Sequence, residues 1–356
     1  MKKYELEFVD MLSKIIFKTD YMKSIFLDPR KGFEPTEENI QVRYDPLTGK
    51  TGHFSHVGAI YAQKLDLEKY QDPLVKGYCP FCGERENQAT PKFTEEIISE
   101  GRMMQGESLL VPNLFPYDIY SAVNIMTDDH VVPLDEFNSK RLIDSFSVGI
   151  EFLKRVKSKD PSIPFHLMAW NYMPPSGGGL VHPHQQYFAT KYPGNQFLDE
   201  LEASKAFFEQ HRIDYWSELI QEEQEREERY IGKLGDSYWL TSFISLGILG
   251  EILCIFPGVF CIERFTDQNV SELVSGLRII FDYYLKKNIY SFNASLFFGP
   301  GEQEYFPAHF RIVPRTFLNT RDYAPDLNFF QAIMQEPVSV VMPEDLCKEI
   351  KDYFRV

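Results

Sequence analysis

The sequence predicts an α+β fold in which two related modules are built around antiparallel sheet flanked by helices. Strands, a helix, a strand, a Gly-rich loop and a further strand occur in the same order twice along the 356 residues. The chain also holds 30 Phe and 20 Tyr, enough bulky apolar side chains for a sizeable core. The repeated order points to an internal duplication, with little residue identity left between the two copies.

The first copy is predicted from alternating and helical patterns between residues 108 and 190. Residues 108–126 are rich in Val, Ile, Tyr and Phe and are interrupted by Pro112 and Pro116, which indicates two strands. Residues 135–159 carry apolar side chains at helical spacing and predict an amphipathic helix. Strands are expected over 164–172 and 182–190, with a Pro/Gly loop between them.

The second copy follows a charged helical stretch that begins after residue 195. Apolar strands are expected between 238 and 263, followed by a helix through Leu273 and Leu277, a strand near 290–298 and a strand over 308–313. We therefore divide the chain into a helical arm over 1–40, a first module over 41–195 and a second, degenerate module over 196–356.

Composition narrows the function classes. A formal net charge of −15 argues against a polynucleotide partner, because binding to a phosphate backbone relies on clustered Lys and Arg. Residues 1–18 contain too many charged residues for a signal peptide, and no apolar run is long enough to cross a membrane. Five cysteines in so long a chain are no disulfide scaffold, so we expect a cytoplasmic protein.

The strongest chemical signal is the segment His182-Pro-His184-Gln-Gln186, preceded by Gly177, Gly178 and Gly179. In an extended strand, alternate side chains share a face, so both histidines and the glutamine are expected to project together. Polar groups in such a row are costly to bury without partners. The alternative is an exposed, solvated strand.

A histidine in this setting suits transfer of a nucleotidyl group. A neutral imidazole can attack phosphorus and can leave again, which splits one difficult displacement into two. The three glycines allow backbone N–H groups to approach phosphate oxygens, and Gln186 can donate a neutral hydrogen bond to the same phosphate. We predict His184 as the nucleophile and Gln186 as its catalytic partner.

A metal site is predicted from Cys79 and Cys82, whose C-x₂-C spacing can present two thiolates to one zinc ion. Two more ligands are needed, and the candidates are His130 and His182. Such a zinc would be structural, because it would hold the strand that bears His184. The alternative is a reduced cysteine pair without a metal.

Several motifs together resemble the galactose-1-phosphate uridylyltransferase family of the histidine-triad superfamily. They occur in the order Arg43-Tyr-Asp-Pro-Leu-Thr-Gly49, Cys79-Pro-Phe-Cys82, Val111-Pro-Asn-Leu-Phe-Pro116, Asp129-His130 and the His182–Gln186 segment. The resemblance implies a ping-pong transferase in carbohydrate metabolism that forms a uridylyl-histidine and works as a homodimer.

The resemblance also assigns residues. It implies that Cys79, Cys82, His130 and His182 bind zinc, and it makes Asn171 an active-site asparagine, with Asn113 and Phe115 in the segment that cradles the nucleoside. Two departures from the family are important. Leu114 replaces the aspartate that contacts uridine in many relatives, and His309-Phe-Arg311 replaces a His-x-His pair of a second metal site. Glu200 or Glu202 is left to stand for that site's glutamate, and we expect no second metal.

The sequence therefore predicts a nucleotidyltransferase that moves a nucleoside monophosphate of the UMP type between a nucleotide sugar and a sugar 1-phosphate. The alternatives are a phosphorylase or hydrolase with an adenylyl cargo, and a non-catalytic nucleotide-sugar binder. His309 and Arg311 share a strand face, so we predict that they contact the substrate, with a purely structural pair as the alternative.

Overall fold

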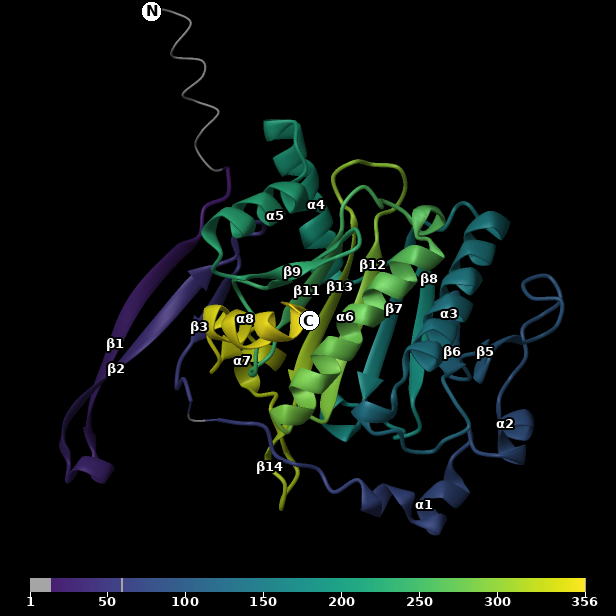
Figure 1. The fold of residues 1–356 in the computed structure, drawn as a ribbon, viewed down its shortest axis with the longest axis horizontal. Coiled ribbons are helices and arrows are strands. Elements are labelled where there is room, and N and C mark those ends of the chain that lie inside the picture. The colour runs from purple at the N-terminus through teal and green to yellow at the C-terminus, as the bar shows by residue number, and fades with distance from the viewer. Residues whose placement is uncertain (1–13, 59, 356) are drawn as a thin grey trace, which may run out of the picture.

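The computed structural model describes residues 14–58 and 60–355, and within them one ten-stranded sheet forms the centre of the molecule (Figure 1). Its strand order is β4-β5-β6-β8-β7-β12-β13-β11-β10-β9. The strands are β4 (Met103–Gln105), β5 (Ser108–Pro112), β6 (Tyr120–Ile125), β7 (Phe165–Tyr172), β8 (His184–Thr190), β9 (Tyr230–Leu234), β10 (Ser237–Thr241), β11 (Ile252–Phe256), β12 (Ser291–Phe298) and β13 (Ala308–Arg315).

The two halves of this sheet have mirrored strand orders. From the outer edge to the centre, the first half reads β4-β5-β6-β8-β7 and the second half reads β9-β10-β11-β13-β12. The halves meet where β7 pairs with β12 in antiparallel register, Ala169 opposite Ser295. The α+β fold with antiparallel sheet is confirmed, and the two copies lie in one continuous sheet.

Two long helices cover one face of the sheet, one for each half. Helix α3 (Ser139–Lys159) contacts β4, β5, β6 and β8, α6 (Asp267–Lys286) contacts β9 and β10, and the two helices touch each other (Figure 1). Their apolar residues and the inward side chains of the strands form the main core, with Phe146, Trp170 and Leu277 fully buried. Removing this apolar surface from water is the main stabilising contribution.

The opposite face of the sheet is covered unequally. Over the second half, α4 (Asn195–His211) and α5 (Tyr215–Arg226) pack Phe197, Tyr215 and Trp216 against Leu253 and other strand residues. Over the first half, Leu109, Val111, Val123 and Ile125 form a small buried cluster, and the partly buried Phe81 packs against it. A cavity lies beside this cluster, and Val111 and Val123 form part of its wall.

The predicted N-terminal helical arm is wrong for residues 18–40. These residues lie in an antiparallel hairpin of β1 (Lys18–Asp28) and β2 (Glu34–Tyr44) that projects away from the main sheet (Figure 1). A tight turn at residues 28–32 makes these residues a hairpin where a helix was predicted. In this turn, Asp28 accepts a hydrogen bond from the backbone of Arg30, and Gly32 takes a left-handed φ of 66°. The part of the predicted arm over residues 1–13 lies outside the described residues.

The remaining elements are short strands and helices, two of which extend the sheet of the hairpin. β2 continues to pair with β3, which pairs in turn with β16, and β14 and β15 form a separate small ribbon. Their bounds are β3 (Thr51–Phe54), β14 (Phe317–Asn319), β15 (Ala324–Pro325), β16 (Val338–Ser339), α1 (Pro73–Tyr78), α2 (Glu84–Ala89), α7 (Phe329–Ala332) and α8 (Pro343–Lys351). Among the described residues, no helix is long and apolar enough to span a membrane.

We expect Gly149→Ala to lower the stability of the protein, although alanine normally favours a helix. Gly149 lies in α3, where an added Cβ would overlap the buried ring of Tyr187 on β8. Overpacking of this kind costs about 1–3 kcal/mol, more than the gain in helix propensity. Thermal unfolding measures the difference. The matched control is Gly77→Ala in α1, where a Cβ meets open space and no loss is expected; an equal effect of both substitutions would contradict this packing.

Candidate functional site

The site is centred on His184, the first residue of β8. This strand lies between β6 and β7, with Gln186 opposite Val123 on one side and Ala169 on the other. Gln185 and Tyr187 are buried, whereas His184 and Gln186 are only partly buried. The alternation predicted from the sequence therefore brings His184 and Gln186 to one face of the first half, where both side chains are partly accessible.

A hydrogen bond to the backbone of His182 orients the ring of His184. Its Nδ1–H donates a hydrogen bond to the carbonyl oxygen of His182, at 2.8 Å. A carbonyl oxygen can only accept, so the hydrogen bond assigns the proton to Nδ1 and leaves the lone pair on Nε2. Burial lowers the pKa of His184, which favours the neutral imidazole. The result is a neutral histidine with one reactive nitrogen.

His184 and Gln186 line a cavity of about 190 Å³. Its other walls are Pro80 and Phe81, the segments 89–91 and 111–115, Val123 and Leu180. None of these described lining residues carries a charge, and most are apolar. Predicted site residues Asn113 and Phe115 are in the wall, where the Asn113 side chain accepts a hydrogen bond from the Phe115 backbone at 3.0 Å. A flat ring such as a nucleobase suits a pocket of this size and polarity.

The glycine loop and Asn171 lie beside this strand. Gly177 ends the short turn 174–176 with a φ of 81°, a left-handed conformation that favours glycine. Gly178 approaches the backbone carbonyl of Asn171, where a Cβ would be at 3.2 Å, and Gly179 faces open space. Asn171 is two residues beyond Ala169, the register partner of Gln186, so it shares their face next to His184.

Cys79, Cys82, His130 and His182 form a second, buried cluster. One ligand atom from each lies within 4.8 Å of all the others. The Sγ of Cys82 is 3.3 Å from Nδ1 of both His130 and His182, and the Sγ of Cys79 is 3.6 Å from Nδ1 of His182. A tetrahedral ion bound by thiolates and imidazoles holds such atoms about 3.5 Å apart. The four residues thus fit a metal ion.

The surroundings of the cluster agree with this fit. Nε2–H of His182 donates to the backbone carbonyl of Thr127 at 2.7 Å, which leaves Nδ1 with the lone pair that a metal requires. Burial lowers the pKa of His182 to about 4 and raises that of Cys82 to about 12. Buried thiols and neutral imidazoles form only weak hydrogen bonds with each other, whereas a bound cation would stabilise the deprotonated thiolates of Cys79 and Cys82.

His182 and His184 therefore belong to different groups, which the alternation argument did not anticipate. β8 begins only at His184, so His182 precedes the strand and turns into the cysteine cluster. The ring of Phe81 contacts both, with centroid separations of 5.7 Å to His182 and 5.6 Å to His184. Phe81 is a site residue that the sequence reasoning missed, although it stands inside the Cys-Pro-Phe-Cys motif.

His309 and Arg311 occupy the corresponding place in the second half of the sheet. A row across the strands runs from Gln186 through Ala169 and Ser295 to Arg311, so the mirrored order makes Arg311 the counterpart of Gln186. By the same relation, His309 is the counterpart of His184. Within the shared row, three strand spacings, roughly 14 Å, separate Gln186 from Arg311.

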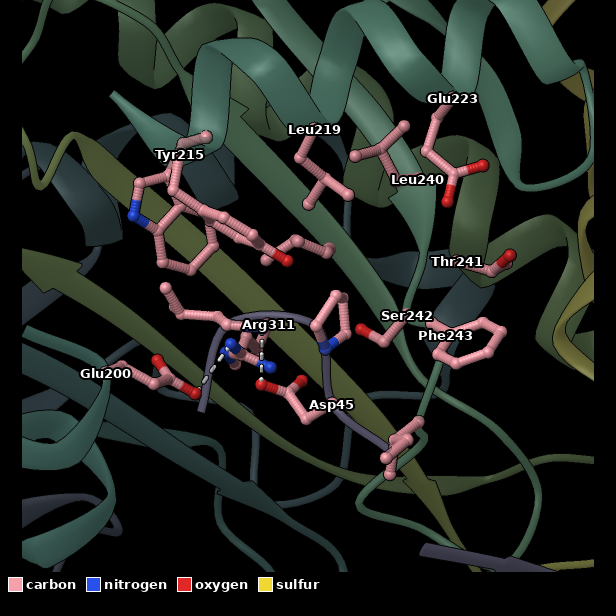
Figure 2. A pocket seen from close by; sticks show the side chains of 15 residues that line it. Asp45, Glu200, Tyr215, Leu219, Glu223, Leu240, Thr241, Ser242, Phe243 and Arg311 are labelled. Atoms are coloured by element: carbon pink, nitrogen blue, oxygen red, sulfur yellow. Dashed lines mark hydrogen bonds and ion pairs between the residues drawn. The ribbon is translucent and has the colours of Figure 1, made fainter. Parts of the chain in front are cut away.

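The second position is filled by protein side chains, and Figure 2 shows those around Arg311, with Glu200 among them. His309 has no exposed surface and stacks on Trp216 of α5, with ring centroids 4.4 Å apart. Arg311 donates to Glu200 at 2.8 Å and to Glu251 at 2.5 Å. The cavity next to Arg311 has a volume of only about 40 Å³, room for a water molecule or two but not for a nucleotide.

The substrate-binding role predicted for His309 and Arg311 is therefore corrected. The structure does not bring them to the cavity around His184, because α4 and α5 cover this part of the sheet. Their setting is that of the structural pair that the sequence left as the alternative. The guanidinium of Arg311 neutralises two buried carboxylates that no other described cation contacts at this distance.

We expect Arg311→Met to destabilise the protein by about 3–5 kcal/mol at pH 7, the usual cost of leaving buried charges without their partner. Burial raises the pKa of Glu200, but Arg311 and His309 outweigh it and lower this pKa to about 2. The pair thus contributes stability above pH 4.5, and this contribution is lost as the pH falls toward 2. Without Arg311, Glu200 can take up a proton, so the deficit should shrink at pH 4.5.

Urea unfolding at the two pH values measures this deficit. Arg278→Met is the control, because Arg278 is exposed on α6 and its hydrogen bond to Ser139 is a surface contact. A deficit for Arg311→Met that is below about 1 kcal/mol at pH 7, or that does not change with pH, would refute the structural role.

Comparisons with known proteins identify a relative and a shared fold. No family model matches the chain. A protein of Archaeoglobus fulgidus described as uncharacterized is 31% identical over 322 residues, which is 89% of this chain and 93% of that protein. This relative has no described activity, so it brings a family but no function.

Two solved structures have the same fold. An ADP-glucose phosphorylase from Arabidopsis thaliana with bound ADP-glucose has a TM-score of 0.65 at 16% identity, over 88% of this chain and 99% of the other. A uridylyltransferase mutant has a TM-score of 0.63 at 18% identity, over 88% and 98%. At such identities the likeness shows the fold, and it agrees in fold with the family that the sequence motifs resemble.

Proposed function

We propose, from the premise that the chain belongs to one family with the uncharacterized Archaeoglobus fulgidus protein, that it is a nucleotidyltransferase acting through a covalent nucleotidyl-histidine on His184. The donor is a nucleotide sugar, the cargo is a nucleoside monophosphate of the UMP type, and the acceptor is a sugar 1-phosphate. The observation that carries this proposal is the orientation of His184: its Nδ1–H donates to the carbonyl oxygen of His182, and its ring lines a nucleoside-sized cavity.

The first displacement of the proposed reaction follows from this orientation. Nε2 of His184 attacks the phosphorus of the nucleotidyl group, a P–N bond forms, and the P–O bond to the sugar phosphate breaks. The positive charge that develops on the ring is shared with the carbonyl of His182 through the Nδ1–H bond. Sugar 1-phosphate leaves as a dianion, so it needs little help from a proton donor.

The second displacement reverses these steps with a different phosphate. An oxygen of the acceptor sugar 1-phosphate attacks phosphorus, the P–N bond breaks, and His184 returns to its neutral form. The amide of Gln186, which lines the cavity beside His184, and the backbone of Gly177–Gly179 are the groups we assign to the phosphate oxygens. The apolar walls near Val111 and Phe115 would hold the nucleoside and keep water from the adduct.

We assign zinc to Cys79, Cys82, His130 and His182, because two thiolates and two imidazoles are a common ligand set for this ion. When bound, it would supply a rigid cross-link, not a Lewis acid for the reaction, since all four positions are taken by protein. His182 is both a proposed ligand and the residue whose carbonyl orients His184. Binding would therefore fix the nucleophile.

The test of the mechanism is covalent labelling. We expect wild-type protein incubated with UDP-glucose labelled at the α-phosphorus to retain acid-labile label, and His184→Ala to retain none, because His184 carries the one nucleophilic nitrogen among the described residues that line the cavity. His211→Ala at the end of α4 is the control and should label as wild type does. Label that survives in His184→Ala would exclude this nucleophile.

The same assay separates the related activities. Label from ADP-glucose that is released by inorganic phosphate would favour a phosphorylase over a transferase, whereas binding of nucleotide sugars without any label would favour a non-catalytic binder.

Metal analysis tests the zinc assignment independently of activity. We expect about one zinc per chain in the purified protein, and its loss in Cys82→Ser together with a lower thermal unfolding temperature, because metal binding adds to the free energy of folding. Cys347→Ser is the control, since Cys347 is buried in α8 away from the cluster and should keep the metal. Wild-type protein without stoichiometric metal would refute the assignment.

A further inference from the structure

Asn293 of β12 connects the second half of the sheet to the site in the first half. Its Nδ2 donates to Oδ1 of Asn171 at 2.6 Å and to the backbone carbonyl of Ser176 at 2.9 Å. Asn293 is the register partner of Asn171 across the junction of β7 and β12. One amide thus holds both an active-site side chain and the start of the glycine loop.

Arg315, at the end of β13, determines which way this amide points. Its Nη1 donates to Oδ1 of Asn293 at 2.6 Å. A guanidinium can only donate, so the oxygen of Asn293 must face Arg315 and its NH₂ group must face Asn171 and Ser176. The orientation of the Asn293 amide therefore follows from the chemistry of its neighbour.

Arg315 is itself held firmly. Its guanidinium forms a two-pronged pair with Asp326, in which Nη2 donates to Oδ1 at 2.6 Å and Nε donates to Oδ2 at 3.1 Å. Asp326 is buried and also accepts from the backbone N–H of Thr316 at 3.1 Å. Bidentate pairs of this kind restrict both partners strongly. If the Arg315 side chain turned away from Asn293, the buried Asp326 carboxylate would lose its cationic partner.

The orientation of the Asn293 amide fixes the orientation of the Asn171 amide. Because the oxygen of Asn171 accepts from Asn293, its own NH₂ group is the part left for a ligand, and among the described residues it has no protein partner. A hydrogen-bond donor beside His184 stabilises the charge that grows on phosphoryl oxygens, whereas an acceptor there would repel it. The orientation of this one amide thus decides whether the site favours or disfavours phosphoryl transfer.

We propose that Arg315 and Asn293 are positioning residues: they form a relay that forces Asn171 to present a donor to the transferred phosphoryl group and ties the glycine loop through Ser176. This inference rests on the proposed nucleotidyl transfer at His184. It assigns the second half of the sheet a role in the reaction, although that half's own counterpart of the site is closed.

Asn293→Asp tests the polarity with almost no change of shape. A carboxylate at this position would still accept from Arg315, but it would also accept from Asn171, whose amide would then turn its oxygen toward the phosphate. We expect the rate of adduct formation at saturating UDP-glucose to fall about 100-fold, the usual effect of losing one such donor. The KM for the donor should change little, whereas the thermal unfolding temperature should fall, because the carboxylate would also face the carbonyl oxygen of Ser176.

Comparison with Asn293→Ala separates a relay from simple packing. Alanine leaves Asn171 free to take either orientation, so it should cost less activity than aspartate, with a loss of roughly 10-fold. If the residue only filled space, the order would be reversed, because alanine removes more atoms. Ser295→Ala is the control on the same strand and face, and it should react as wild type does.

The outcomes distinguish this inference from the proposed function. No adduct in the wild type would refute the nucleotidyl transfer itself. An adduct in the wild type with Asn293→Asp equal to it, or with Asn293→Ala the slower of the two variants, would refute the relay and leave the transfer standing. Rates are normalised to the folded fraction measured by circular dichroism, so a variant that folds poorly still gives a comparison.

Discussion

The hydrogen bond from Nδ1 of His184 to the carbonyl oxygen of His182 is the interaction on which the rest of the site depends. It fixes the ring, selects the tautomer and leaves one nitrogen available for attack. The residue that accepts it also contributes its side chain to the buried cysteine and histidine cluster. Three consecutive residues, His182 to His184, thereby join a candidate metal centre to a candidate nucleophile, and any movement of the first group would turn the ring of the second.

The mirrored sheet explains why the chain has one reactive centre and not two. Both halves place a histidine at equivalent positions, but α4 and α5 pack mainly on the second half, where Trp216 stacks on His309. In the first half, Phe81 and the segment 111–115 leave a cavity next to His184. The second half contributes in another way, because β12 and β13 lie next to β7 and place Asn293 against Asn171.

Local patterns in the sequence were sufficient for the strands and helices of the sheet, for placing His184 and Gln186 on one face and for the Cys79–Cys82 pair, because spacing alone determines which side chains share a strand face or a turn. The family resemblance added His130 and His182 to the pair. Local patterns did not predict the structure of residues 18–40. The apolar spacing there resembles that of a helix, but the turn at residues 28–32 reverses the chain and forms a hairpin. Local patterns also could not place Arg311 or Asn293, whose surroundings depend on how distant segments pack. The role of Arg311 follows from Glu200 and Glu251, residues 111 and 60 positions away in the chain.

The stereochemistry at phosphorus tests the central claim, that His184 forms a covalent intermediate, most directly. Each in-line displacement inverts the configuration at phosphorus, so attack by His184 followed by attack of the acceptor gives net retention. A nucleotide sugar made chiral at the α-phosphorus with sulfur and oxygen isotopes reports the result by ³¹P NMR of the product. We expect retention. Net inversion would mean a single direct transfer between the two phosphates, and His184 would not be a nucleophile.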